Sequence, residues 1–185
     1  MRKIILDLAV TLDGFIEGPK GETYWCIMDD DMDFAGFLAS IDTILYGRVS
    51  YDLWGNFQPQ ADANEAEKAI WKAVHSKKKY VFTNRPQEGE EKDEFVVGSN
   101  IIAEKVEQIK QQPGKDIWLY GGASLIKSFI ELDLIDLYRI SLHPTVLGAG
   151  KPLFENLEQR INLKLIDLRR FKSGVVQLIY EPMEK

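Results

Sequence analysis

The stretch LYGGASLIK, residues 119–127, decides how the rest of the chain is interpreted. The run just before it, residues 117–120, is apolar and rich in strand formers, and the residues after it repeat at helical spacing. Two glycines therefore stand where a strand leads into a helix. Because glycine has no Cβ, another group can approach the backbone there, and the amides of Gly122, Ala123 and Ser124 would point outward at a helix N-terminus. The stretch predicts either a phosphate site or a tight turn packed on a neighbouring strand.

The composition of the chain excludes several classes of protein. With 185 residues, 45% of them hydrophobic and 28% charged, the chain can fill one core and does not require two domains. The net charge of -6 argues against a general nucleic-acid-binding protein. Cys26 is the only cysteine, so an intramolecular disulfide is excluded, and its spacing from His75 and His143 fits no metal site. Asp7 and Asp13 interrupt the apolar N-terminal run, so we expect no signal peptide, no membrane span and a cytoplasmic protein.

Apolar runs and helical repeats alternate along the first two thirds of the chain. The runs typical of strands are residues 3–10, 43–46, 79–83, 94–97, 117–120, 136–142, 163–171 and 175–180. The helical repeats are residues 31–40, 49–54, 63–76, 101–111 and 124–132. This order predicts a single α/β domain over residues 1–185, with a mixed, mainly parallel central sheet flanked by helices. The end of the chain predicts an antiparallel hairpin that turns at residues 172–174, and the acidic residues 87–93 predict a solvated loop.

A second junction between a strand and a helix reads TILYGRVSYDLW, residues 43–54. Gly47 follows the strand, Arg48 comes next, and Ser50 lies two residues further on. A guanidinium and a hydroxyl beside helix N-terminal amides would hold an anion better than amides alone. The alternative for Arg48 is an ordinary surface salt bridge.

A third strand ends in VFTNRP, residues 81–86, and offers Thr83, Asn84 and Arg85 at its carboxyl end. Ligands of open α/β sheets bind outside these ends. The alternative for Arg85, as for Arg48, is an ordinary surface salt bridge. Three such ends, two with an arginine and one with a glycine pair, predict a ligand with more than one phosphate. A dinucleotide is the obvious candidate, but no G-x-G-x-x-G follows the first strand, so a standard Rossmann dehydrogenase is not expected.

Four segments taken together resemble one family. They are AVTLDGFI (residues 9–16), LYGRVSYDLW (residues 45–54), VFTNR (residues 81–85) and IWLYGGASLIKSFIELDLIDLYRISLHPTVLGAGKPLF (residues 117–154). The combination resembles the dihydrofolate reductase superfamily, and within it the C-terminal reductase domain of the bacterial riboflavin biosynthesis protein RibD. The resemblance follows nearly the whole chain in order. It implies a dihydrofolate reductase-like sheet with a C-terminal antiparallel hairpin.

The resemblance also implies an activity, a cofactor and a set of site residues. It implies an NADPH-dependent oxidoreductase that transfers a hydride to a small heteroaromatic, pterin- or pyrimidine-like substrate, similar to 5-amino-6-(5-phosphoribosylamino)uracil reductase. In such proteins the glycine pair supports the nicotinamide and the pyrophosphate, often through a non-proline cis peptide. The residues implied at the cofactor are Ala9, Leu12, Gly47, Arg48, Ser50, Thr83, Asn84, Arg85, Gly121, Gly122, Ala123, Ser124, Leu125, Leu147 and Gly148. Relatives are commonly homodimers through the C-terminal strands, although a monomer whose hairpin packs on its own sheet fits the same pattern.

Hydride transfer to a C=N or C=O group also needs a proton, which an acid or water can supply. Asp33 at the start of the first helix is one candidate, because the folate enzymes carry their acid on that helix, and Asp13 in the first loop is the other. The alternatives are a helix cap for Asp33 and a turn for Asp13. Trp25 and Trp54 are candidates for lining a flat substrate pocket, or they belong to the core or an interface.

Two sequence features limit the resemblance. The zinc deaminase domain of the bifunctional riboflavin proteins needs P-C-x-x-C, which a chain with one cysteine cannot supply. The first loop lacks the tryptophan and prolines of the folate enzymes, so dihydrofolate is not the expected substrate. Two other functions remain open: a nucleotide-binding module without efficient turnover, and a protein-interaction domain in which the glycine junctions are only turns.

Overall fold

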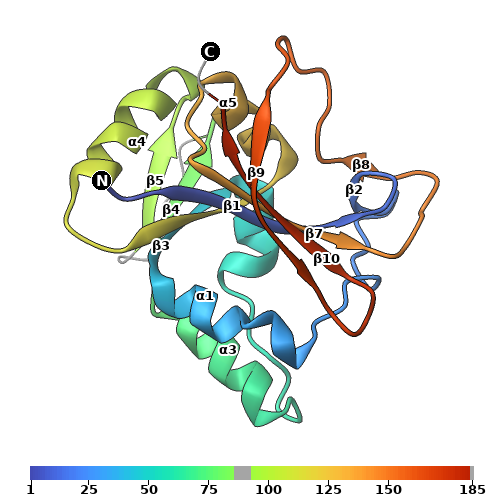
Figure 1. Ribbon diagram of the computed structural model, residues 1–185. Helices are drawn as coiled ribbons and strands as arrows, with labels where there is room; N and C mark the ends of the chain where they lie inside the picture. Colours follow the sequence, from blue (N-terminus) through green and yellow to red (C-terminus); the bar gives the residue numbers. More distant parts are fainter. Residues whose placement is uncertain (86–92, 184–185) are drawn as a thin grey trace.

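The computed structural model describes residues 1–85 and 93–183. Its centre is an eight-stranded sheet in the order β5-β4-β3-β6-β1-β7-β10-β9 (Figure 1). The strands are β1 (Ile4–Thr11), β3 (Ile41–Gly47), β4 (Lys78–Thr83), β5 (Asp93–Val97), β6 (Asp116–Gly121), β7 (Leu137–His143), β9 (Leu163–Arg170) and β10 (Val176–Pro182). All pairs from β5 to β7 are parallel, and β10 is antiparallel to both β7 and β9. The predicted mixed, mainly parallel sheet with a C-terminal hairpin is confirmed.

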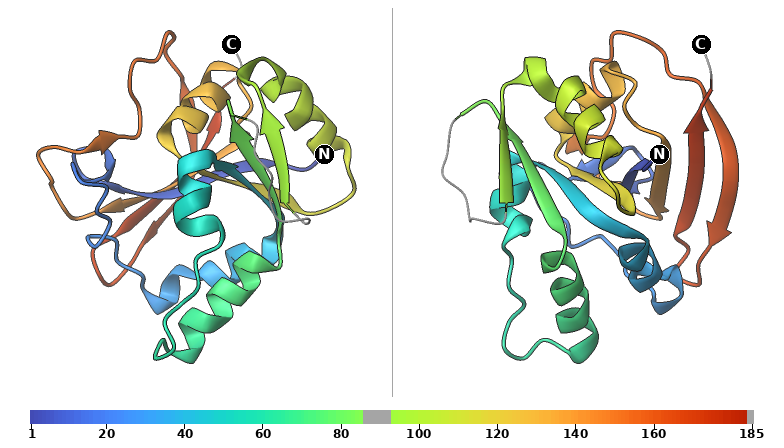
Figure 2. Two further views of the ribbon diagram at one scale, coloured as in Figure 1. Left: turned by 180° about the vertical axis from the view of Figure 1, so that it is seen from behind. Right: turned by 90° about the vertical axis from the view of Figure 1, so that its left-hand side faces the viewer.

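Helices cover both faces of this sheet. The longer ones are α1 (Phe34–Ser40), α3 (Glu65–His75), α4 (Ile102–Gln111) and α5 (Ala123–Glu131). The short ones are η1 (Asp30–Met32), α2 (Arg48–Ser50), η2 (Tyr51–Gly55) and η3 (Ser99–Ile101). Figure 2 shows α1 and α3 on one side of the sheet and α4 and α5 on the other. None of the helices in the described part of the chain combines the length and the apolar character that a membrane crossing needs.

The apolar core is split by the sheet into two clusters, because alternate residues of a strand point to opposite faces. On β1, Ile4 and Leu6 belong to the cluster under α4 and α5. Ile5 belongs to the cluster with residues of α1 and α3. Asp7 lies two residues after Ile5 and so lies on the α1 and α3 side of the sheet. This alternation determines which residues of β1 can reach a site on that side.

Several element ends differ from the sequence prediction by a few residues, and the helix expected over residues 31–40 is broken at Asp33 into η1 and α1. Two short strands and the start of β5 also differ. β2 (Phe15–Glu17) and β8 (Lys151–Pro152) pair as a small antiparallel sheet of their own, and both are too short for a two-residue period to be recognised. Asp93, expected in a solvated loop, is instead the buried first residue of β5. The rest of that expected loop, residues 87–92, lies outside the described residues.

Candidate active site

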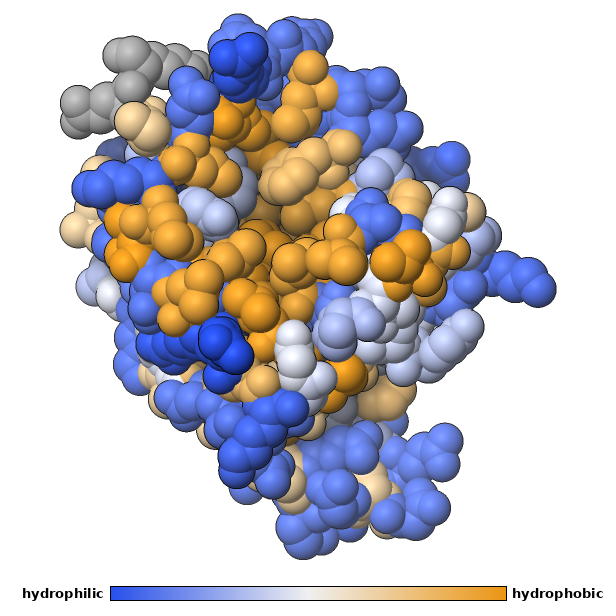
Figure 3. All heavy atoms as spheres, turned by 45° about the vertical axis from the view of Figure 1, so that its right-hand side comes forward, coloured by the Kyte–Doolittle hydropathy of each residue, from blue (hydrophilic) through white to orange (hydrophobic). Residues whose placement is uncertain are grey.

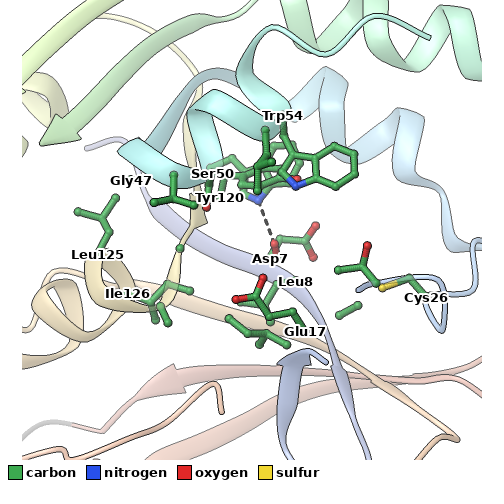
Figure 4. Close-up of a pocket in the computed structure, with 18 of the residues that line it drawn as sticks. Asp7, Leu8, Glu17, Cys26, Gly47, Ser50, Trp54, Tyr120, Leu125 and Ile126 are labelled. Atoms are coloured by element: carbon green, nitrogen blue, oxygen red, sulfur yellow. Dashed lines mark hydrogen bonds between the residues drawn. The ribbon is translucent and has the colours of Figure 1, made fainter. Parts of the chain in front are cut away.

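A cavity of about 890 Å³ opens at the carboxyl ends of β3, β4 and β6 and continues over β1 and β7. Volumes of roughly 300–1,000 Å³ are usual for small-molecule sites. Apolar side chains gather around a hollow in the face drawn in Figure 3. The close-up in Figure 4 shows labelled residues of β1, of the segment after β3 and of α5 arranged around the cavity. The strand ends that the sequence singled out therefore meet at one cavity.

The two predicted glycine junctions touch each other at the edge of this cavity. A Cβ on Gly47 would lie 3.1 Å from the amide nitrogen of Gly122 and 3.4 Å from the carbonyl oxygen of Gly121. A Cβ on Gly122 would lie 3.0 Å from Oγ of Ser50. The peptide bond between Gly121 and Gly122 is cis, as the resemblance implied. The absence of side chains at these positions allows the segment after β3 to lie directly against the N-terminus of α5.

Most of the predicted cofactor residues lie around the cavity. Those that line it are Ala9, Gly47, Arg48, Ser50, Thr83, Asn84, Gly122, Ala123, Ser124 and Leu125. Those that do not line it are Leu12, Arg85, Gly121, Leu147 and Gly148. Most of the residues expected at the strand ends therefore line the cavity, and the cofactor role of all these residues stays a prediction.

Arg48 has intramolecular partners in addition to its place on the cavity wall. Its Nε donates to Oδ2 of Asp52 at 2.8 Å, one helical turn away, and its guanidinium lies 5.7 Å from the ring centre of Phe95. The salt bridge expected as the alternative is thus present. Its side chain is nevertheless 28% exposed, so a bound anion can also reach it.

The end of β4 forms a short turn beside the cavity. Oγ1 of Thr83 accepts a hydrogen bond from the backbone nitrogen of Arg85 at 3.1 Å, and the carbonyl oxygen of Thr83 accepts one from the nitrogen of Gly98 at 3.0 Å. Thr83 and Asn84 face the cavity together with Ser99, a residue that the sequence analysis did not single out. Arg85 is exposed at the outer edge of this turn.

Asp33 is placed as a helix cap and does not line the cavity. It adopts a left-handed conformation with φ of 50°, and its Oδ1 accepts a hydrogen bond from the nitrogen of Gly36 at 3.0 Å. This is the interaction that an N-cap aspartate makes with the first turn of a helix. The geometry supports the capping alternative, and an acid role for Asp33 stays a prediction.

Asp13 holds two loops together outside the cavity. Its carboxylate accepts hydrogen bonds from Oγ1 of Thr11 at 2.6 Å, from the nitrogen of Leu147 at 3.1 Å and from the nitrogen of Gly148 at 2.7 Å. The bond from Thr11, followed by those from the two backbone amides, lowers the pKa of Asp13. A carboxylate held in this way stays ionised near neutral pH and therefore carries no proton to donate.

The two candidate substrate tryptophans occupy different environments. Trp54 lines the cavity, and its ring stacks on Trp71 with centres 6.2 Å apart. Trp25 is buried and packs edge-on against His143 at 5.4 Å, and it does not itself line the cavity. Trp54 can therefore contact a bound ring, whereas the observed packing of Trp25 matches the core alternative.

A polar strip on β1, β7 and β10 was missed by the sequence analysis. Asp7 is paired in register with Arg139, and Ser141 with Gln177, and all four residues line the cavity. The only sequence signal was a charged residue inside an otherwise apolar strand, at Asp7. The strip depends on the register of three strands that are far apart in sequence, and a single chain pattern does not give that register.

The electrostatics of the strip centre on Asp7. Burial raises the pKa of this carboxyl to about 6, and the nearby Arg139 opposes the rise. Nε of Arg139 lies 3.5 Å from Oδ1 of Asp7, and its guanidinium stacks 4.5 Å from the ring centre of Phe37. The indole nitrogen of Trp118 donates to the backbone carbonyl of Asp7 at 3.0 Å, the dashed line in Figure 4. Asp7 is therefore fixed in position, with a carboxyl group that can hold a proton near neutral pH.

His143 ends the strip on β7 and is held by the loop above it. Its Nδ1 accepts a hydrogen bond from the nitrogen of Ile27 at 3.2 Å. Burial lowers the pKa of His143, and Asp29 opposes that effect. Within residues 1–85 and 93–183, no group of three or more His, Cys, Asp or Glu side chains is arranged to hold a metal ion.

Comparisons with known proteins agree with this fold. The family model described as the RibD C-terminal domain matches residues 2–177. The chain is 60% identical to the uncharacterized protein YyaP of Bacillus subtilis (strain 168), over 97% of this chain and 94% of that protein. Its fold matches that of a putative riboflavin biosynthesis protein from Shewanella sp. PV-4, with a TM-score of 0.80, 23% identity and full coverage of both chains. It also matches a dihydrofolate reductase from Enterococcus faecalis complexed with NADP(H), with a TM-score of 0.66, 14% identity and coverage of 98% and 97%.

Proposed function

The chain belongs to the RibD C-terminal domain family, and from that premise we propose that it is an NADPH-dependent reductase. Residues 1–185 would act as one dihydrofolate reductase-like domain that reduces a small heteroaromatic, pterin- or pyrimidine-like compound. The observation that carries the proposal is the meeting of three strand ends at one cavity, with the two glycine junctions in contact at its edge. The complex of the Enterococcus reductase with NADP(H) supports the choice of cofactor through a shared fold.

The residues present fit a dinucleotide on structural grounds. Side chains at Gly47 or Gly122 would fill the space between the two junctions, and both positions lack one. The backbone is accessible there, and α5 presents its N-terminal amides beside the hydroxyl of Ser50, an arrangement that favours a pyrophosphate. Arg48 adds a partly exposed cation, and Thr83 and Asn84 add polar groups at the next strand end.

These residues divide the cavity into two parts. Gly47, Arg48, Ser50 and the start of α5 would hold the phosphates, and the end of β4 with Arg85 would contact the adenosine ribose and its 2′-phosphate. NADPH, when bound, supplies a hydride. The part of the cavity over β1 and β7, with Trp54 at its side, would hold the ring that is reduced, because apolar walls exclude water and keep a flat ring in place.

The test is a titration of the purified protein with NADPH and with NADH, followed by nicotinamide fluorescence. We expect micromolar binding of NADPH and weaker binding of NADH. Arg85→Ala would weaken NADPH binding and leave NADH binding unchanged, because a charge-assisted contact to the 2′-phosphate contributes about 1.5–3 kcal/mol. Arg160→Ala is the matched control, since it removes an exposed arginine from the segment between β8 and β9, whereas Arg85 directly follows Thr83 and Asn84, which line the cavity.

The outcomes separate the proposal from its alternatives. Binding of NADPH without consumption across a panel of cyclic imines, pterins and pyrimidines would favour a nucleotide-binding module. Binding of neither nucleotide would contradict the reductase function and favour an interaction domain with the same fold.

A further inference from the structure

The carboxyl group of Asp7 lies in the cavity wall and has no hydrogen-bond partner among the described residues. Asp7 is only 8% exposed, and a buried charge is costly unless it is paired. Its ion pair with Arg139 is long, at 3.5 Å, whereas charge-assisted bonds are usually about 2.7–2.9 Å. Within the described residues, no donor forms a hydrogen bond to this carboxyl group. A ligand in the cavity can therefore take that place.

Gln177 gives a second and independent indication of a polar ligand. Its side-chain nitrogen donates to Oγ of Ser141 at 3.2 Å, and the residue is 2% exposed. Its side-chain oxygen is buried without a hydrogen-bond partner among residues 1–85 and 93–183. Buried polar atoms are nearly always paired, so an orphan in a cavity wall indicates a group supplied from outside.

Charged and titratable groups of several elements surround Asp7. Arg139 on β7 is its nearest partner, and it stabilises the ionised form of Asp7. The other titratable or charged residues that line the cavity are Glu17, Cys26, Arg48, Glu67, Tyr120, His143 and Lys151. Glu17 is paired with Lys151 at 3.1 Å, so its charge is already balanced. The protonation state of Asp7 is therefore determined by two opposing effects. Burial favours the protonated acid, and Arg139 favours the carboxylate.

We propose that Asp7 is the acid of the reaction: its carboxyl group contacts the substrate and delivers the proton that accompanies hydride transfer. Arg139 and Gln177 are positioning residues on the same strip. The inference rests on the reductase function proposed above. It assigns the acid role to a strand of the central sheet, in place of the helix start and the loop that the sequence suggested.

The step balances for a substrate with a C=N bond. The carbon gains the hydride that NADPH supplies, the C=N π bond breaks, and the nitrogen takes its proton from the Asp7 carboxyl group. The carboxylate that remains is stabilised by Arg139 until water restores the proton. A carboxyl group whose pKa lies near 6 suits this role, because it is partly protonated close to neutral pH and is still a strong enough acid.

The experiment compares Asp7→Asn with the wild type and with Glu17→Gln, which changes another carboxylate of the same cavity. The activity probe is 6-methyl-7,8-dihydropterin, whose ring contains a C=N bond, with NADPH consumption recorded across the pH range. We expect wild-type kcat to fall as pH rises through the pKa of Asp7. Asp7→Asn should lower kcat by roughly 10²–10⁴-fold, the usual contribution of a positioned acid, and flatten that profile. NADPH affinity should be unchanged in both variants.

A second readout does not depend on turnover. In protein labelled with ¹³C at the aspartate carboxyl groups, the Asp7 signal is identified by its loss in Asp7→Asn. It should titrate near pH 6, titrate at higher pH in Arg139→Gln, and shift when 6-methyl-7,8-dihydropterin is added to the protein alone and to its NADP⁺ complex.

The outcomes distinguish this inference from the function on which it rests. Full kcat with an unchanged pH profile in Asp7→Asn would overturn the acid role while leaving an NADPH-dependent reductase. Failure of the dihydropterin to bind, or binding that does not move the Asp7 signal, would overturn the contact. Failure of the wild type to bind NADPH would contradict the reductase function, and the carboxyl signal would still report whether Asp7 meets the ring.

Discussion

Gly47 and Gly122 approach each other so closely that a Cβ on Gly47 would lie 3.1 Å from the amide nitrogen of Gly122. The atom in the way belongs to the backbone, which cannot move aside as a flexible side chain can. We therefore expect Gly47→Ala to push the two junctions apart and to lower the free energy of unfolding by about 1–3 kcal/mol, as overpacking does. NADPH affinity should fall by roughly tenfold or more, which corresponds to a loss of about 1.4 kcal/mol or more of binding free energy.

Gly18→Ala is the control for this change. The atoms nearest to a Cβ on Gly18 belong to the side chain of Glu22, which can rotate away. Urea unfolding and the NADPH titration would be run on both variants. Wild-type stability and affinity in Gly47→Ala would show that the contact between the junctions does not shape the site.

The raised pKa of Asp7 predicts that the free energy of unfolding depends on pH. The pKa rises from 3.8 to about 6 on folding, so the folded state holds a proton that the unfolded state has already lost between these values. Stability attributable to Asp7 is thus present at low pH and is lost as pH rises through 6. The loss amounts to about 3 kcal/mol, at about 1.4 kcal/mol per pKa unit.

The measurement is urea unfolding of the wild type and Asp7→Asn across this pH range. The free energy of unfolding of the wild type, relative to that of the variant, should decrease between pH 3.8 and just above pH 6 and stay constant beyond. A difference that does not vary with pH would mean that the carboxyl group is solvated as in the unfolded chain.

Much of the fold and part of the site could be predicted from the sequence. Long apolar runs, helical repeats and the glycine pair are local signals, so the sheet and the two glycine junctions followed from them, whereas the contact between Gly47 and Gly122 is visible only in the structure. Asp7, Arg139 and Gln177 come together only through the register of β1, β7 and β10, which no local pattern encodes. In the sequence, Asp7 is only an interruption of an apolar run, and its neighbours across the sheet place it in the cavity wall.

The edge strand β9 predicts self-association. Leu165, Ile166 and Leu168 are 48%, 48% and 47% exposed on a strand that pairs only with β10 within the described residues. Exposed apolar side chains on an edge strand favour pairing with another chain. We expect the wild type to be a homodimer and Leu168→Glu to be a monomer, while the exposed turn variant Lys172→Glu remains a dimer. Size-exclusion chromatography with light scattering measures the mass, and a monomeric wild type would contradict the prediction.

Variants of Asp33 test whether this residue is the acid of the reaction, as the sequence suggested, or only a helix cap, as the structure indicates. Its carboxylate caps α1 by accepting from the nitrogen of Gly36, and its φ of 50° is a conformation that asparagine also tolerates. Asp33→Asn should therefore retain both the cap and the fold, and Asp33→Ala should cost about 0.5–2 kcal/mol of stability. If Asp33 only caps the helix, Asp33→Asn will consume NADPH like the wild type. Asp33→Ala will have a lower free energy of unfolding without a comparable loss of kcat. A large drop in kcat for Asp33→Asn at unchanged stability would instead return the acid role to the helix start, where the resemblance had placed it, and would leave Asp7 as a residue that only positions the ring.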